Sequence, residues 1–350
     1  MAELNTHIGI KALDGPGVER LFAGLGQPHY RAEQLIRWLY QVGVNQFEEM
    51  TDLPATLRQE LSRDFALPVP ELVAQQISEI DGTRKYLWRL ADGTEIESVG
   101  LPSGDRLTVC FSTQAGCAMG CTFCATGRAG FVRDLAPGEI VDQVRLVGKD
   151  FGRRVTNAVA MGQGEPFANY TATLGALRLM NAENGLGIGA RHLTVSTCGL
   201  IGGIERFATE PEQFTLAVSL HSAVQETRDS LMPAMSGARL DRLRVALADY
   251  VHKTGRRPTL EFALIAGVND TDAEREALVR FCRGLHCHVN LILVNPVQGS
   301  PMSRSSDSLA RTFVTALSAT GTESSVRVER GTDIDAACGQ LKQRISGVDA

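Results

Sequence analysis

Hydrophobic residues in the first part of the chain recur at the spacing of α-helices. In the segment 30–39, apolar residues at positions 32, 35, 36 and 39 fall on one helical face, and the segment 54–65 repeats this spacing with Pro54 in its first turn. The proline-rich run LPVPE at 67–71 follows and is typical of a boundary. This pattern predicts a small helical N-terminal domain over residues 1–75.

Beyond this boundary, the hydrophobic pattern changes to that of strands. The runs KYLWRL and TEIESVGL flank Ala91-Asp92-Gly93, which is a hairpin signal, so we assign residues 76–106 to a hairpin and linker. Short apolar, β-branched runs follow at 107–112, 155–161, 193–197, 214–220, 259–265 and 289–294, with another at 325–329. Helical patterns fill most of the intervals. Six parallel strands at this spacing predict an α/β fold, a partial or complete six-stranded (β/α) barrel within a catalytic domain of residues 107–350.

Composition and charge narrow the possible classes of protein. The 350 residues contain no run of eighteen apolar residues, and the N-terminus MAELNTHIGI lacks the features of an export signal, so we expect a cytoplasmic protein without a membrane span. In that compartment, eight cysteines are more readily explained by metal binding and catalysis than by structural disulfides. The net charge of −5 is not typical of nucleic-acid binding, so any RNA contact must rest on local basic patches, such as those within 149–154 and 253–257.

The segment 116–127, GCAMGCTFCATG, carries the most specific chemical signal. Cys117, Cys121 and Cys124 have C-x-x-x-C-x-x-C spacing, so one short loop can bring three thiolates around one inorganic centre. A structural zinc site normally has four protein ligands, and an electron-transferring 4Fe–4S cluster normally has four thiolates. Three cysteines therefore indicate a cubane with one open iron that can bind a substrate. A zinc loop with a distant fourth ligand, or three unrelated buried cysteines, are the alternatives.

Other chemically distinctive residues follow nearly every predicted strand. In chain order they are Gly164 and Glu165 in GQGEP, Ser196, then Ser219, Leu220 and His221, and finally Asn295. Because the active site of an α/β barrel lies at the carboxyl ends of its strands, we expect these residues to share one site. Taken singly, each also has an ordinary structural explanation, such as a turn glycine, a capping serine or a buried histidine.

Four longer motifs occur in order along the chain: GCAMGCTFCATGRAGFVRDL, MGQGEP, VSLHSAVQETRDSLMP and, near the C-terminus, RGTDIDAACGQL. Together they resemble the radical S-adenosylmethionine (SAM) RNA adenine methyltransferases of the RlmN/Cfr family, over residues from about Ile96 to Leu341. The resemblance implies a radical SAM barrel and an N-terminal accessory domain that contacts RNA. It also implies a 4Fe–4S cluster on the three cysteines, with SAM bound to the open iron. The residues that it assigns to SAM binding are Gly164, Glu165, Ser196, Ser219, Leu220, His221 and Asn295.

The resemblance further implies roles for two other cysteines and a glutamate. Cys338 would take a methyl group from one SAM by nucleophilic displacement and become S-methylcysteine. A radical from a second SAM would abstract hydrogen from this methyl group, and the resulting methylene radical would add to adenine. Cys110 would release the adduct through a transient disulfide with Cys338, while Glu97 would accept a proton from the adduct. The structural alternatives are buried core cysteines and, for Glu97, an exposed strand carboxylate.

The family also implies substrates and partners. We expect methylation of carbon 2 of an adenine in the peptidyl-transferase centre of 23S rRNA and of an adenine in the anticodon loop of tRNA. The expected enzyme is a monomer that takes electrons from a reductant such as flavodoxin or ferredoxin. The alternative within the family is methylation of carbon 8 of the rRNA nucleotide, and the alternative outside it is a non-catalytic iron–sulfur or zinc RNA-binding protein.

The sequence departs from the family pattern at a few positions. Gln163 stands where methionine is common, Cys198 replaces a small residue or valine, and Ala234-Met235 replaces the usual pair after the proline. None of them is a predicted ligand. Among the remaining cysteines, Cys282 falls on an apolar helical face, so we expect it to pack in the core.

Overall fold

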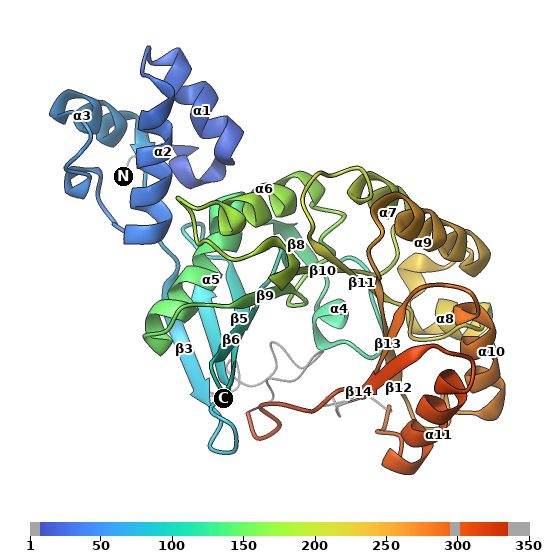
Figure 1. Cartoon of the computed structure of the whole chain (residues 1–350). Helices are drawn as coiled ribbons and strands as arrows, with labels where there is room; N and C mark the ends of the chain where they lie inside the picture. The colour runs from blue at the N-terminus through green and yellow to red at the C-terminus, as the bar shows by residue number, and fades with distance from the viewer. Residues whose placement is uncertain (1–7, 295–301, 335–350) are drawn as a thin grey trace.

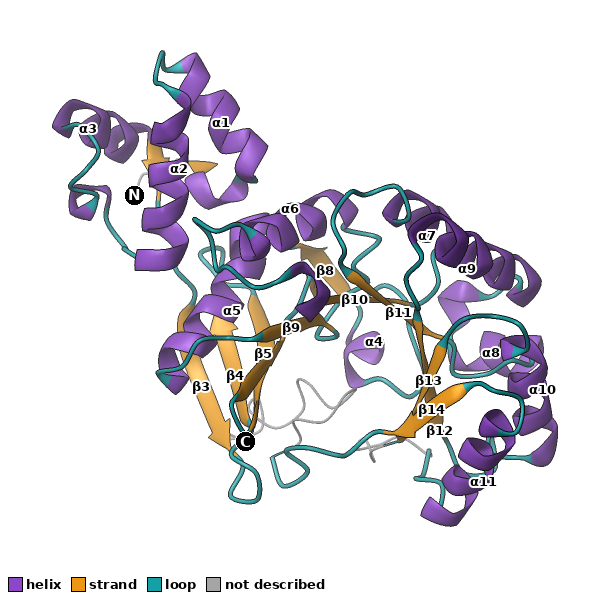
Figure 2. Ribbon diagram, in the orientation of Figure 1, coloured by secondary structure: helices purple, strands orange, loops and turns teal. Residues whose placement is uncertain are grey.

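The computed structural model describes residues 8–294 and 302–334, and its N-terminal region is mainly helical (Figures 1 and 2). The elements of this region are β1 (Ile8–Gly9), η1 (Ile10–Ala12), α1 (Gly15–Gly24), α2 (His29–Arg37), η2 (Trp38–Val42), η3 (Phe47–Glu49), α3 (Ala55–Asp64) and β2 (Phe65–Ala66). The two predicted helical stripes form α2 with η2, and α3. Their apolar residues, such as Leu35, Leu39 and Leu57, are buried as the pattern requires. The short strands β1 and β2 pair in parallel and bring the two ends of the region together.

A single curved sheet organises the rest of the chain. Its strands are β3 (Glu71–Ile77), β4 (Arg84–Arg89), β5 (Glu95–Ser103), β6 (Arg106–Cys110), β9 (Asn157–Ala160), β10 (Leu193–Thr197), β11 (Thr215–Ser219), β12 (Thr259–Leu264), β13 (His288–Leu293) and β14 (Glu323–Val326). Their order in the sheet is β14-β13-β12-β11-β10-β9-β6-β5-β4-β3. From β6 to β14 all neighbouring strands are parallel, whereas β3 to β6 pair in antiparallel fashion. The predicted partial barrel is confirmed, and β14 extends it by a seventh parallel strand.

Helices connect the parallel strands and cover the convex side of the sheet (Figure 1). They are α5 (Pro137–Phe151), α6 (Tyr170–Asn181), α7 (Ile201–Phe207), α8 (Gln225–Leu231), α9 (Leu240–Thr254), α10 (Asp272–Cys282) and α11 (Asp307–Ser318), with the short turns η4 (Ala190–His192) and η5 (Pro233–Met235). The first of them shows why they form here: α5 begins with Pro137, buries Ile140, Val144 and Val147 at helical spacing, and ends at Gly152 with φ +60°. The short helix α4 (Ala125–Ala129) lies instead on the concave side (Figure 1).

The segment expected as a hairpin and linker is part of the same sheet. β4 and β5 form the predicted hairpin around Gly93, whose φ of +83° suits the turn. β3 already begins at Glu71, before the expected domain limit, and pairs with β4. The sheet also continues across the expected limit at residue 106, where β6 begins. The domain limits at residues 75 and 106 stay predictions.

The N-terminal helices pack against α5 and α6 through both apolar and ionic contacts. Lys11 Nζ lies 2.7 Å from a carboxylate oxygen of Asp142 on α5, and both side chains are at most 3% exposed. Gly138 permits this approach, since a Cβ atom there would lie 2.4 Å from Cβ of Lys11. The module is thus fixed to α5, the helix that follows β8 (Phe131–Asp134). No helix in the described part of the chain has the length and apolar character needed to cross a membrane.

Candidate active site

A cavity of about 170 Å³ lies at the carboxyl ends of the parallel strands, on the concave side of the sheet. Loops that follow successive strands line it, as the sequence predicted from the position of the distinctive residues. The predicted site residues in its lining are Cys117, Cys121, Cys124, Gly164, Glu165, Ser196, Ser219 and His221. Residues more than 100 positions apart in the sequence therefore meet in one place. Asn295 lies outside the described residues.

A small hairpin holds the cysteine loop. β7 (Gln114–Gly116) enters the loop, and β8 (Phe131–Asp134), which pairs with β7, follows α4. Cys117 N–H donates a hydrogen bond of 2.9 Å to the carbonyl of Gly130, so the loop closes on itself directly at the first cysteine. Gly116 has φ +72°, and a Cβ atom there would lie 2.0 Å from the Gly130 oxygen. Only glycine fits this close approach.

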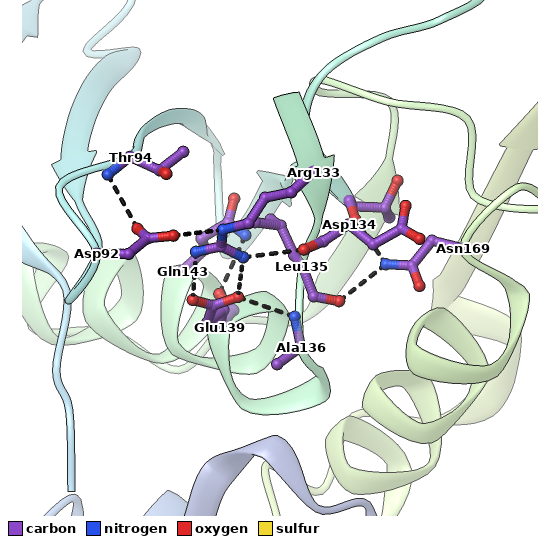
Figure 3. A network of polar contacts seen from close by, with 10 residues as sticks. Asp92, Thr94, Arg133, Asp134, Leu135, Ala136, Glu139, Gln143 and Asn169 are labelled. Carbon is purple, nitrogen blue, oxygen red and sulfur yellow. Dashed lines mark hydrogen bonds and ion pairs between the residues drawn. The ribbon is translucent and has the colours of Figure 1, made fainter. Parts of the chain in front are cut away.

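A network of ion pairs and hydrogen bonds holds the β7–β8 hairpin against its neighbouring elements (Figure 3). Arg133 on β8 forms ion pairs with Glu139 on α5 at 2.8 Å and with Asp92 in the β4–β5 turn at 2.6 Å. The Arg133 hydrogen bond lowers the pKa of Asp92 to about 2. Asn169 donates to the carbonyls of Thr113 and Leu135, at 2.8 Å each. The network thereby joins the hairpin to α5, to the β4–β5 turn and to the start of α6.

The GQGEP loop after β9 packs directly against the strand that leads to the cysteines. Gly162 N–H donates to the carbonyl of Phe111, and the carbonyl of Gln163 accepts from Thr113 and Gln114. Gly164 has φ +103°, and a Cβ atom there would lie 2.6 Å from Cβ of Gln114. Its backbone therefore lies against the loop of the neighbouring strand. Gln163, which replaces the common methionine, points away from the cavity lining and is buried.

Glu165 connects this loop to the next one. Its side chain is buried, and its two oxygens accept hydrogen bonds from the backbone N–H groups of Phe167, at 2.9 Å, and Cys198, at 2.7 Å. Burial raises the pKa of Glu165, while these two donors oppose the shift. Glu165 also lines the cavity, where a carboxylate can accept from a cationic or N–H group of a ligand.

His221 has an unusual backbone and a defined tautomer. Among the described residues it alone has positive φ without being glycine, at +56°, which places a buried side chain in the left-handed region. Its Nδ1 accepts from the backbone N–H of Ala263 at 3.1 Å, and Phe123 packs edge-on against the ring at 4.7 Å. Burial lowers the pKa of His221 to about 3, so the ring is neutral at pH 7. Because Nδ1 accepts, the proton resides on Nε2, which is a donor.

Leu220 differs from the other predicted ligands. Its side chain is fully buried and does not line the cavity. Its N–H donates to the carbonyl of Glu261, and its carbonyl accepts from Ser222. The predicted contact between Leu220 and SAM therefore has no counterpart in the cavity lining, and the residue instead fixes the backbone that carries His221.

Comparisons with known proteins identify the family. A model of the ribosomal RNA large subunit methyltransferase N-terminal domain matches residues 8–67, and a model of the radical SAM superfamily matches residues 111–282. The chain is 46% identical over 340 residues to a probable dual-specificity RNA methyltransferase RlmN of Pelotomaculum thermopropionicum, covering 97% of this chain and 92% of the relative. A protein of the same name from Symbiobacterium thermophilum is 44% identical over 349 residues, with 98% and 94% covered. The crystal structure of a radical SAM methyltransferase from Sphaerobacter thermophilus matches with a TM-score of 0.88 at 44% identity, over 95% of this chain and 98% of that one.

The chain belongs to the RlmN family of radical SAM methyltransferases. The family and fold class expected from the sequence are thereby confirmed. A 4Fe–4S cluster and SAM are the cofactors of this family and hence of this chain. A non-catalytic metal protein is no longer a competing interpretation.

The cavity of this RlmN-family chain has the donor set that these cofactors need. Three thiols line one side, and burial raises the pKa of Cys117 to about 11 and that of Cys121 further. Such thiols stay protonated until a metal binds and replaces the proton. Within the described residues, no three His, Cys, Asp or Glu side chains are grouped around a single-ion site. A cubane does not need such a group, because each thiolate binds a different iron.

Cys110 and Glu97 lie on adjacent strands behind the cavity. Cys110 is opposite Val99 in the β5–β6 register, so Glu97, two residues before Val99, is its diagonal neighbour on the same face. Cys110 packs with Met161, which itself lines the cavity. The Glu97 side chain is 1% exposed and forms an ion pair with Lys85 at 3.2 Å. The alternative considered from the sequence, in which Glu97 is an exposed carboxylate on a strand, is therefore wrong.

The C-terminal motif approaches the same place. Ile334 packs against Val99 and Cys110, and Asp333 accepts from Glu79 N–H at 3.0 Å. Cys338 lies outside the described residues. It follows Ile334 by only four residues.

Sequence reasoning missed several residues of the cavity. Those with polar or sulfur-containing side chains are Met119, Thr126, Met161, Cys198, Met232, Glu261 and Arg327. Glu261 is the most informative, because burial raises its pKa and Asn290 donates to it at 2.8 Å. Its signal in the sequence was a single acid inside the apolar run TLEFALI. Cys282, in contrast, packs in the hydrophobic core as expected.

Proposed function

We propose that this chain methylates carbon 2 of adenine in RNA, at adenine 2503 of 23S rRNA and adenine 37 of tRNAs. The observation that carries the proposal is the single cavity lined by the cysteine loop and by residues after β9, β10 and β11, with Cys110 and Glu97 behind its wall. The name of the relatives, dual-specificity RNA methyltransferase, supports more than one RNA substrate, whereas the choice of carbon 2 over carbon 8 rests on the resemblance of the sequence motifs. When bound, the cluster and SAM supply a methyl group and a radical that abstracts hydrogen.

The cavity residues bind and orient the cofactors in this proposal. Cys117, Cys121 and Cys124 hold the cluster as thiolates. Gly164 lets SAM approach the backbone closely because it has no side chain, and Glu165 accepts a hydrogen bond from the amino group of SAM. The other polar contacts to SAM come from Ser196, Ser219, His221 and Asn295. The neutral His221 serves as an Nε2–H donor, since its Nδ1 is already engaged. The reductant, such as flavodoxin or ferredoxin, and a monomeric state are further parts of the proposal.

The two cysteines perform the transfer. The Cys338 thiolate attacks the methyl group of SAM, S-adenosylhomocysteine leaves and the cysteine becomes S-methylcysteine, because adenine carbon is too weak a nucleophile to attack SAM itself. After the methylene carbon is bonded to adenine, the adduct must lose one electron and the proton of the ring carbon; Glu97 accepts the proton, and the electron would return to the oxidised cluster. The Cys110 thiolate then attacks the Cys338 sulfur, the sulfur–methylene bond breaks as the disulfide forms, and the methylene carbon takes up a proton to become the methyl group of the released adenine.

The position of Ile334 supports this pairing of Cys110 with Cys338. Four residues span at most about 14 Å when fully extended. Since Ile334 packs against Val99 and Cys110, the chain between Ile334 and Cys338 is long enough for the sulfur atoms of Cys110 and Cys338 to meet. The contacts from Arg330 to Ser103 and from Gly331 to Asp81 anchor the segment that precedes Ile334 on the β3–β6 side of the sheet.

The replacement Cys110→Ala tests the proposal. Without the resolving thiolate, methyl loading and attack on adenine should proceed, and RNA should remain covalently attached to Cys338. We expect a ribonuclease-sensitive species of higher mass on a denaturing gel. Cys110→Ala/Cys338→Ala should form no such species, and Cys282→Ala, which removes another buried cysteine, should turn over normally. Undiminished methylation by Cys110→Ala without any adduct would contradict the assignment.

A further inference from the structure

A second cavity, of about 530 Å³, lies between the N-terminal helices and the barrel. Residues of η2, the second half of α5 with the turn after it, and the segment 185–188 line it. Four of the lining residues are cationic: Arg145, Lys149, Arg153 and Arg154. No acidic residue is among the described residues in the lining. We call this cavity, defined by these four residues, the basic groove.

Arg145 is the buried member of the basic groove. Its side chain is 8% exposed, and Nε donates to Asp142 at 2.8 Å. Its Nη2 atom is buried and has no hydrogen-bond partner within the described residues. Gly43, with φ +76°, brings the η2 backbone close to the guanidinium, since a Cβ atom there would lie 2.6 Å from Nη1. A buried N–H without an acceptor is unfavourable, so this position calls for an anionic or carbonyl acceptor.

The other three cations are exposed and partly positioned by the backbone. Arg153 donates to the carbonyl of Gly104 at 2.7 Å, and Arg154 donates to that of Gly187 at 2.5 Å. Each guanidinium has five N–H groups, so most of them remain for a ligand. Lys149 has no ion pair with any described residue. The C-terminal end of the α5 dipole opposes an anion here, but its half charge is smaller than the summed charge of the three exposed cations.

The features of the basic groove fit a phosphate backbone rather than a nucleobase. Its aromatic ring, Tyr40, is 3% exposed and cannot stack on a base. Cationic side chains without an acidic partner in the lining are typical of contacts to phosphates, which carry no sequence information. Their concentration contrasts with the net charge of −5 of the whole chain.

The basic groove is remote from the active-site cavity. Val155 and Ile188 in its lining precede β9 and β10, so the groove lies at the amino ends of the strands. The 15 residues of α5 lead from the cysteine hairpin to the groove, a length of about 22 Å at 1.5 Å per residue. An RNA that reaches both the groove and the active-site cavity must therefore extend well beyond the target nucleotide.

We propose that the basic groove binds the phosphate backbone of the RNA substrate at a distance from the reacting adenine, and so anchors a stem rather than the target loop. The inference rests on the proposed RNA methyltransferase function. The inference implies that an RNA whose stem is too short to reach the basic groove lacks the phosphate contact there, although it still presents the adenine to the active site.

The test compares Lys149→Glu/Arg153→Glu with Arg242→Glu/Arg311→Glu, which makes the same charge change at exposed residues of α9 and α11, outside both basic patches of the sequence. Binding is measured against a full-length tRNA transcript and against its anticodon hairpin with a stem of about three base pairs. We expect the groove variant to lose at least about tenfold affinity for the tRNA, with a salt dependence reduced by about one to two phosphate contacts. Its affinity for the hairpin, and its methylation of that hairpin, should match those of the control variant.

Three outcomes would overturn the proposal. The groove variant could bind the tRNA as well as the control does, or it could lose equal affinity for both RNAs, which indicates a general charge effect. Titration with inorganic phosphate could also show binding that the groove variant abolishes while tRNA affinity is unchanged, which would assign the groove to a free anion. If the wild-type chain methylates neither RNA, the proposed function fails instead, and the binding comparison still tests the groove.

Discussion

The buried ion pair between Lys85 and Glu97 offers a sharp test of how the catalytic strands are held. Both side chains are 1% exposed, and Nζ lies 3.2 Å from Oε1. Lys85 is opposite Val99 in the β4–β5 register, and Val99 is opposite Cys110, so the pair borders the proposed resolving cysteine. Lys85→Met keeps the length of the side chain but leaves a buried carboxylate without its cation. Breaking a buried pair in this way destabilises proteins by about 3–5 kcal/mol.

Urea unfolding of the apoprotein measures this change. Trp88 on β4 is buried and donates to Ser98 at 2.7 Å, so its fluorescence reports on the strands that carry the pair. With a slope near 3 kcal/mol/M, as expected for a chain of this size, a loss of 3–5 kcal/mol lowers the midpoint by about 1–2 M. Lys253→Met removes an exposed lysine and should change the midpoint little.

A double replacement separates the pair from simple packing loss. Lys85→Met/Glu97→Leu removes both charges, and apolar replacement of a buried pair is often neutral or stabilising. The double variant should therefore recover most of the midpoint that Lys85→Met loses. If Lys85→Met behaves like Lys253→Met, or if the double variant is as unstable as the single one, the ion pair does not hold these strands as argued.

Two further predictions concern the cavity. Burial lowers the pKa of His221 from 6.5 to about 3, so between these pH values the unfolded chain binds more protons than the folded chain. The contribution of the neutral ring to the free energy of unfolding is therefore fully present above pH 6.5. It falls on acidification by up to about 1.4 kcal/mol per pH unit. His221→Asn, which tolerates positive φ, should flatten the pH dependence of the unfolding midpoint between pH 6.5 and 5, and an unchanged slope would contradict the assignment. Gly164→Ala places a Cβ atom 2.6 Å from Gln114 in a backbone with φ +103°, so SAM binding, measured by calorimetry on the reconstituted enzyme, should fall at least about tenfold. Gly202→Ala, where a Cβ atom meets nothing within 4 Å, is its control, and equal affinity in both variants would refute the close-packing argument.

The sequence allowed the barrel strands to be predicted well because each is a short apolar run between helices. The run at 259–265 is β12, and the run at 193–197 coincides with β10. It could not show that β3, β4 and β5 continue the barrel sheet, since strand alternation does not determine which sheet a hairpin joins. For the same reason it could not show that Glu97 is buried beside Lys85.

The candidate site was predictable where residue type and strand position coincide. Ser196 and Ser219 end their strands and line the cavity, as expected. Glu261 was missed because it lies within β12 rather than at its end, and only the β11–β12 register places it opposite Ser219 in the cavity lining. Leu220 was predicted to contact SAM because it lies between Ser219 and His221 in a motif, and its side chain is buried outside the cavity lining. Predictions on Cys338 and Asn295 remain, since both lie outside the described residues.

Hydrogen bonds join several loops of the site to the loop or strand that neighbours them in the sheet. Thr113 after β6 donates to Gln163 after β9, Cys198 after β10 donates to Glu165 of that same GQGEP loop, and Leu220 after β11 donates to Glu261 on β12. Each loop is thus positioned by the next strand as well as by its own. The three thiols depend on this chain of contacts, because β7 packs against the GQGEP loop. Changes such as Gly164→Ala should therefore disturb cluster binding as well as SAM binding, although no cysteine is altered.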